Sequence, residues 1–219
     1  MYMKGNKSIL AMIVVTSLSV CLMTGCMNFD NSSKTKTQAT KKAESIKLFE
    51  DYSKQMNTLD GVYEVKQDLS KKFSKAITKG GLDVINSTPD GSFVVSLGNT
   101  GKYTKQSIQS LNYSMSEDYK QGKANLNILC VKEYPEDEKL SKSDKYIKAI
   151  YNIFKSLTNS DISRKEFFEL AEKAFNENES MEFPYQDIIP IQVVQVKKSR
   201  KYIKTIQLSC IYEFDIPKA

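Results

Sequence analysis

The fold class is decided by residues 202–214, YIKTIQLSCIYEF, in which apolar and polar side chains alternate. A period of two is typical of a strand that has one buried and one solvated face. The positions expected to face the core are Tyr202, Ile206, Leu208, Cys210, Tyr212 and Phe214. The positions expected to face water are Thr205, Gln207, Ser209 and Glu213. The stretch therefore predicts a long strand of an antiparallel sheet.

Earlier segments supply partners for this strand. Residues 188–197 form a second strand candidate, and residues 198–201 connect the two as a hairpin. Residues 107–115 and 124–131 alternate in the same way, and residues 92–97 form a shorter apolar run after turn-forming residues. Because the loops between the last three segments are short, we expect them to pair antiparallel as a meander.

Four further segments have apolar residues at helical spacing. They are residues 43–57, 60–79, 143–157 and 163–175. Asp60 is the expected N-cap of the second helix and Gly80-Gly81 its end, whereas Ser163 and Glu166 have capping-box spacing before the fourth. The order ααβββααββ predicts an α+β fold, in which helices cover one face of about five antiparallel strands. We expect a single domain over residues 43–219.

The first 25 residues have the features of a secretory signal. Lys4 and Lys7 precede an apolar run at residues 9–23, and Thr24-Gly25-Cys26 follows. As a helix, this run would extend about 22 Å at 1.5 Å per residue, which is shorter than the roughly 30 Å hydrocarbon layer. The pattern therefore predicts a signal peptide at residues 1–25, cleaved between Gly25 and Cys26, rather than a transmembrane anchor.

This segment resembles the signal peptide of bacterial lipoproteins, whose lipobox ends in a small residue and an invariant cysteine. Gly25 and Cys26 match that motif, and Met23 stands where the family usually has Leu. The resemblance implies lipidation of Cys26 and a location at the cell membrane, on its extracytoplasmic face. Residues 26–42 would then form the lipidated start and a polar, flexible tether. The alternative is an ordinary secreted protein with an unmodified Cys26.

Charge limits the classes of partner. The formal net charge is +6, and only Arg164 and Arg200 among the 32 basic residues are arginines. Readers of nucleic acids favour the guanidinium fork, so we expect no nucleic-acid partner. The lysines of the tether either contact anionic head groups or belong to a solvated spacer. They are Lys34, Lys36, Lys41 and Lys42.

Two cysteines remain in the predicted domain, Cys130 and Cys210, and both have the parity of core positions. The simplest interpretation is a pair of buried thiols that pack as small hydrophobic residues. A disulfide is the alternative in an oxidising exterior. Two cysteines without a histidine do not make a metal site.

The chain has no His and no Trp, which removes His-dependent triads and nearly all conventional zinc or haem sites. Ser33 and Lys36 fit a Ser-x-x-Lys motif, but the polar tether cannot desolvate the lysine. The acids at residues 117–118 and 133–138 are expected on solvated loops, with weak calcium binding as the alternative. We therefore assign no catalytic residue, no metal ligand, no cofactor-binding residue and no cofactor.

Tyrosine is the remaining suggestive residue type, because its amphipathic ring is common at contact surfaces. Core packing is the alternative explanation. The tyrosines in question are Tyr103, Tyr113, Tyr119, Tyr134, Tyr151, Tyr185 and Tyr202. The resulting hypothesis is a non-enzymatic, lipid-anchored module, attached to the membrane through its lipid, that binds a protein or envelope partner through the exposed sheet face. The alternatives are a small-ligand-binding lipoprotein and a His-independent enzyme.

Overall fold

The computed structural model describes residues 44–98, 108–135, 137–181, 183–198 and 201–218. These residues belong to one compact unit, Thr40–Ala219. The predicted signal peptide, the predicted lipidation site Cys26 and the predicted tether therefore lie outside the described residues.

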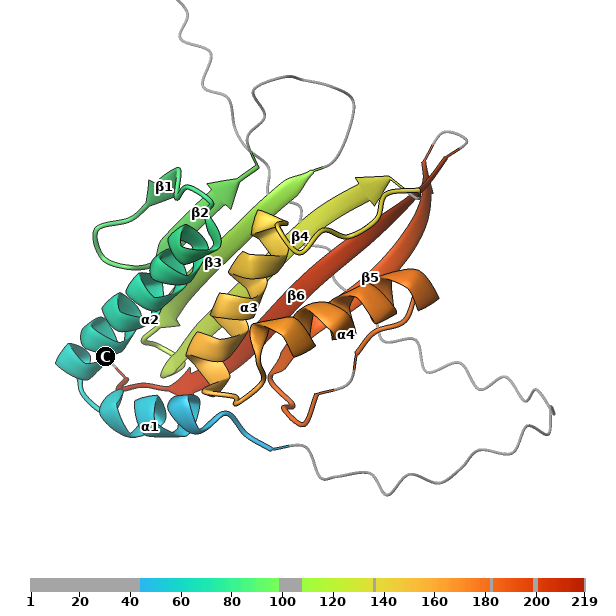
Figure 1. The fold of residues 1–219 in the computed structure, drawn as a ribbon. Coiled ribbons are helices and arrows are strands. Elements are labelled where there is room, and N and C mark those ends of the chain that lie inside the picture. Colours follow the sequence, from blue (N-terminus) through green and yellow to red (C-terminus); the bar gives the residue numbers. More distant parts are fainter. Residues whose placement is uncertain (1–43, 99–107, 136, 182, 199–200, 219) are drawn as a thin grey trace, which may run out of the picture. The chain divides into compact units, whose positions relative to one another are not determined.

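Within these ranges the chain forms four helices and six strands in the order ααββββααββ (Figure 1). The helices are α1 (Lys47–Gln55), α2 (Leu59–Gly80), α3 (Lys145–Thr158) and α4 (Arg164–Glu177). The strands are β1 (Asn86–Ser87), β2 (Phe93–Leu97), β3 (Gln109–Asp118), β4 (Lys123–Pro135), β5 (Ile188–Lys198) and β6 (Lys201–Asp215). The predicted α+β class is confirmed. The expected count of about five strands missed β1, because two residues are too few to show a period.

The strands form a single antiparallel sheet in the order β1-β2-β3-β4-β6-β5. The predicted meander β2-β3-β4 and the predicted hairpin β5-β6 are both present. The two parts meet at β4 and β6, which pair over 13 residues of β4, from Lys123↔Asp215 to Pro135↔Ile203. The long alternating strand quoted first therefore lies inside the sheet.

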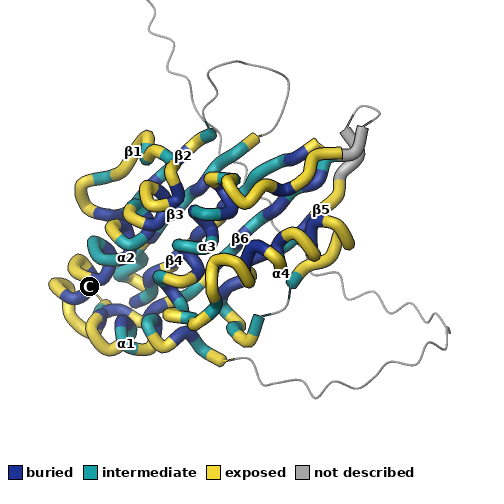
Figure 2. The backbone as a smooth tube through the Cα atoms, in the orientation of Figure 1, coloured by how far each residue is buried: buried dark blue, intermediate teal, exposed yellow. Residues whose placement is uncertain are grey.

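Alternate side chains of the central strands form the core beneath the helices (Figures 1 and 2). The predicted inward residues Ile206, Leu208, Cys210 and Phe214 are buried, and Tyr212 is half-buried. Lys204 shares this face, and its Nζ donates to the carbonyl of Phe175 at 2.7 Å, near the end of α4. On the opposite face of the sheet, Leu129 is 38% exposed and Ile211 is 70% exposed.

Helix ends follow local capping, with one departure from prediction. Thr58, not Asp60, caps α2, and its Oγ1 accepts from the Gly61 amide at 3.0 Å. Both residue types are good caps, so the sequence left the start uncertain by two residues. Gly81 ends α2 with a φ of 88°, and the Ser163 hydroxyl accepts from the Glu166 amide at 3.1 Å, both as predicted.

Helices α2 and α3 approach each other closely at Gly80. A Cβ placed there would lie 2.7 Å from the Ala149 Cα. The Asn152 Nδ2 donates to the Ala76 carbonyl at 3.3 Å across the same contact. This small-residue contact brings the outer faces of α2 and α3 side by side.

The Gly80→Ala variant tests this contact. Alanine is the better helix former by about 1 kcal/mol, but its methyl group would overlap the α3 backbone. We expect the free energy of unfolding to fall by roughly 1–3 kcal/mol, as in other overpacked sites. Urea unfolding followed by far-UV circular dichroism measures this change. Thr78→Ala, at an exposed position of the same helix, is the control; an equal or higher stability for Gly80→Ala would contradict the contact.

Candidate functional site

Several residues singled out in the sequence do not form a site. Gly25 and Cys26, and the Ser33–Lys36 motif, lie outside the described residues. Glu117 was expected on a solvated loop, but it lies in β3 with a side chain only 15% exposed and pairs with Lys66. The prediction was wrong because Lys66, the partner of Glu117, lies 51 residues earlier in the chain, where no local pattern links the two residues. Asp118 and Glu133 also lie in strands, β3 and β4, and are half-buried, whereas Asp137 and Glu138 are exposed, as predicted.

The Lys66 ammonium is a structural connection rather than a catalytic group. It is buried in α2 and pairs with Glu117 of β3 and with Asp90, at 3.4 Å, in the β1–β2 turn. Burial lowers the pKa of Lys66, but the carboxylates of Glu117 and Asp90 outweigh it and hold that pKa above its ordinary value. A lysine that stays protonated is neither a base nor a nucleophile at neutral pH.

The two thiols are free and buried, which confirms the packing interpretation. Cys210 lies opposite Ile128 and Cys130 lies opposite Leu208, so the cysteines are diagonal neighbours on β4 and β6. Diagonal Cβ atoms are farther apart than the roughly 3.5–4.5 Å that a disulfide requires. Burial raises the pKa of both thiols, which keeps them protonated and unreactive.

The tyrosines divide between the core and the surface. Tyr113 and Tyr134 are fully buried, so the contact-surface interpretation is wrong for them. Tyr119, Tyr151 and Tyr185 are half-buried. The side chains of Tyr103 and Tyr202 lie outside the description. Tyr151 is the tyrosine of interest, because it lines two cavities on the outer side of the helices.

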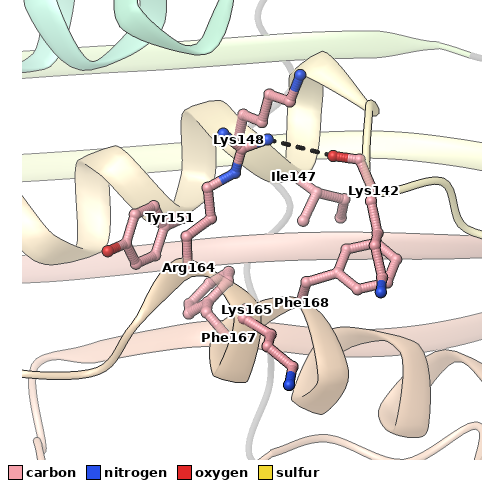
Figure 3. A pocket seen from close by; sticks show the side chains of 8 residues that line it. All are labelled: Lys142, Ile147, Lys148, Tyr151, Arg164, Lys165, Phe167 and Phe168. Carbon is pink, nitrogen blue, oxygen red and sulfur yellow. Dashed lines mark hydrogen bonds between the residues drawn. The ribbon is translucent and has the colours of Figure 1, made fainter.

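The first cavity lies between α3 and α4 and has a volume of about 260 Å³ (Figure 3). Its apolar lining consists of Ile147, Phe167 and Phe168, all buried, together with Tyr151. Its four cationic residues are Lys142, Lys148, Arg164 and Lys165. Figure 3 shows Arg164 extending from the start of α4 toward α3, and its guanidinium donates to the carbonyl of Lys142, in the loop before α3, at 3.2 Å. The cavity thus combines an apolar floor with a cationic rim.

The second cavity is a larger groove of about 660 Å³ between α2 and α3. Five lysines line it: Lys71, Lys72, Lys75, Lys79 and Lys155. The acid in its lining is Asp68, which pairs with Lys72 at 2.5 Å. Burial raises the pKa of Asp68, but hydrogen bonds from Lys72 and Tyr52 outweigh it, so that this pKa stays below its ordinary value. We call the two cavities, which share Tyr151 as a lining residue, the basic groove.

The surface charges of α2 and α4 are arranged in opposite ways. Lys71, Lys75 and Lys79 repeat every four residues on α2, so like charges are neighbours along one stripe. On α4 the same spacing alternates, with Lys165–Glu169 and Lys173–Glu177 pairs at 3.8 and 4.0 Å. Helix α3 contributes Lys148 and Lys155 to the groove and contains no acid between Lys145 and Thr158.

This arrangement suits the binding of anions. Ammonium and guanidinium groups make short, charge-assisted hydrogen bonds to phosphate and carboxylate oxygens. The lysine stripe was visible in the sequence as K-x₃-K-x₃-K, but the α3 side of the groove depends on the Gly80–Ala149 contact.

In the described ranges, no group of three Cys, Asp or Glu side chains could hold a metal ion. Nor does any helix there have the length and hydrophobicity to cross a bilayer.

Comparison of the chain with protein-family models, with curated proteins and with solved structures finds no match.

Lys75→Glu tests whether the lysine stripe opposes stability. The change turns two repulsive i,i+4 pairs, with Lys71 and Lys79, into attractive ones. We expect the free energy of unfolding to rise by about 1 kcal/mol at low salt, and less at high salt, because screening weakens surface pairs. Urea unfolding at two salt concentrations measures it.

Lys173→Glu is the matched control, because Glu169 and Glu177 flank it at the same spacing. It should lower stability by a similar amount. Destabilisation by both variants would show that the α2 lysines do not repel one another.

Proposed function

We propose that this chain is a lipid-anchored, extracytoplasmic, non-enzymatic module that binds an anionic component of the cell envelope through the basic groove. The lipobox-like end of the N-terminal segment, Gly25-Cys26, supports the anchor. The thiols of Cys130 and Cys210 are buried and Lys66 is buried and paired with Glu117, so none of these three groups can act as a nucleophile, which supports a binding role.

One observation carries the choice of ligand. Four cationic side chains line one cavity and five line the other, against a single paired acid, although the whole chain has a formal charge of only +6. Cationic residues therefore outnumber acids nine to one in the linings of the two cavities, although the chain as a whole is nearly balanced. Most are lysines, which act as flexible point charges and suit an anionic surface or polymer better than a single planar ligand.

The helical layer, not the open sheet face, is the better candidate for this contact. The open face carries Asn127, Ser209 and Thr205 beside exposed apolar residues, and its described residues have no comparable concentration of cations. Its charged corner has no excess of positive charge, because Lys123 pairs with two carboxylates, Glu213 at 2.7 Å and Asp215 at 2.9 Å. We therefore move the proposed contact from the sheet to the basic groove.

Intact-mass analysis of the membrane fraction tests the anchor. We expect a mature chain that begins at Cys26 and carries acyl groups, and incorporation of labelled palmitate. Cys26→Ala should abolish that label, whereas Cys21→Ala, which changes the other cysteine of the N-terminal segment, should leave it in place. A native chain that retains Met1, or has an unmodified Cys26, would refute the anchor.

Binding to soluble polyphosphate tests the anion preference independently of the anchor. The full chain in neutral detergent should bind polyphosphate with an affinity that falls as salt rises, because bound lysines release counterions. Lys75→Glu should weaken this binding although it stabilises the fold. Equal affinity of Lys75→Glu and the native chain would contradict the groove as the binding surface. Fluorescence anisotropy of labelled polyphosphate provides the measurement.

A further inference from the structure

The covalent chain limits how far the basic groove can lie from an anchored Cys26. The first described residue is Glu44, 18 residues after Cys26. A chain extends by at most about 3.6 Å per residue, so the two Cα atoms can be no more than about 65 Å apart. If Cys26 is held in a bilayer, as proposed above, the groove meets that bilayer at high effective concentration.

The exposed lysines of the groove fit an anionic leaflet. Lys71, Lys75 and Lys79 are exposed along α2, and Lys155 is exposed on the neighbouring face of α3. None of these four forms an ion pair with another described residue. Each lysine near a surface of anionic lipid strengthens association about fivefold.

The half-buried ring of Tyr151 favours lipid over other anions as the ligand of the basic groove. Phe167 and Phe168 are buried beneath the cationic rim, whereas Tyr151 lines both cavities, and its hydroxyl donates to the Ile162 carbonyl at 3.3 Å. Aromatic rings with a polar tip are favoured at the boundary between lipid head groups and hydrocarbon. A free phosphate chain offers nothing for the half-buried Tyr151 ring to contact, whereas a phospholipid offers its glycerol and acyl carbons.

We infer that the basic groove docks the folded unit onto anionic phospholipid head groups of the membrane that holds Cys26. This inference rests on the proposed lipid anchor and names the partner of the same groove. The helices would then face the bilayer, and the open face of the sheet would point away from it.

A single tryptophan can report this docking, because the native chain has none. The acylated full chain with Tyr151→Trp is reconstituted into vesicles of phosphatidylcholine, alone or mixed one to one with phosphatidylglycerol. A head-group-level quencher lipid is present in both. We expect strong quenching only with phosphatidylglycerol, and its reversal at high salt.

Lys75→Gln, Lys79→Gln and Lys155→Gln together should make docking about a hundredfold weaker, at about fivefold for each lysine. The matched control changes three exposed lysines outside the groove to Gln and should retain the quenching. These are Lys120, Lys139 and Lys173. Far-UV circular dichroism confirms the fold of both variants.

Equal quenching in the two vesicle types would overturn the inference. So would an equal loss of quenching in the triple groove variant and in the triple control variant. Flotation with phosphatidylcholine vesicles measures the anchor separately, so its failure is distinguishable from failure of the groove. Binding to polyphosphate without a phosphatidylglycerol effect would retain the proposed function and overturn the membrane docking.

Discussion

The pairing of β4 with β6 is the constraint on which the rest of the structure depends. It joins strands from the middle and the end of the chain over the whole length of β4, from Lys123 to Pro135. Because β6 enters between β4 and β5, the N-terminal and C-terminal halves share one sheet and one buried face. All four helices then have the same surface to cover, and α2 and α3 must meet above it (Figure 1).

Features set by local patterns could be predicted from the sequence, and features set by distant contacts could not. The period of two in residues 202–214 predicted β6, and the small-residue pair Gly80-Gly81 predicted the end of α2. The pairing of Lys66 with Glu117 could not be read in this way, since nothing local distinguishes Glu117 from a solvated acid. The same holds for the basic groove, whose lysines come from separate helices.

The charge patterns of α2 and α4 have opposite effects on helix stability. Helix α4 uses alternating charges at a four-residue spacing, which stabilises an exposed helix face, whereas α2 places three lysines at that spacing. The core does not require this arrangement, because Lys71, Lys75 and Lys79 all lie on the exposed side of α2. The three lysines repel one another, and further cations line the cavity beside them. Such an arrangement is expected of a surface that binds a negatively charged partner.

A lipid anchor would determine how long the protein stays on the membrane, whereas a basic groove would determine its orientation there. Acyl chains determine how long a protein stays on a membrane, since each buried methylene contributes about 0.8 kcal/mol, but they do not orient a folded unit at the end of a tether. Electrostatic contacts are individually weaker and sensitive to salt, yet they act only when one particular face is turned toward the lipid. Together they would hold the unit in one orientation, with its helices on the membrane. The open sheet face, with Leu129 and Ile211 exposed among polar neighbours, would then be the surface that this protein presents to whatever approaches from outside.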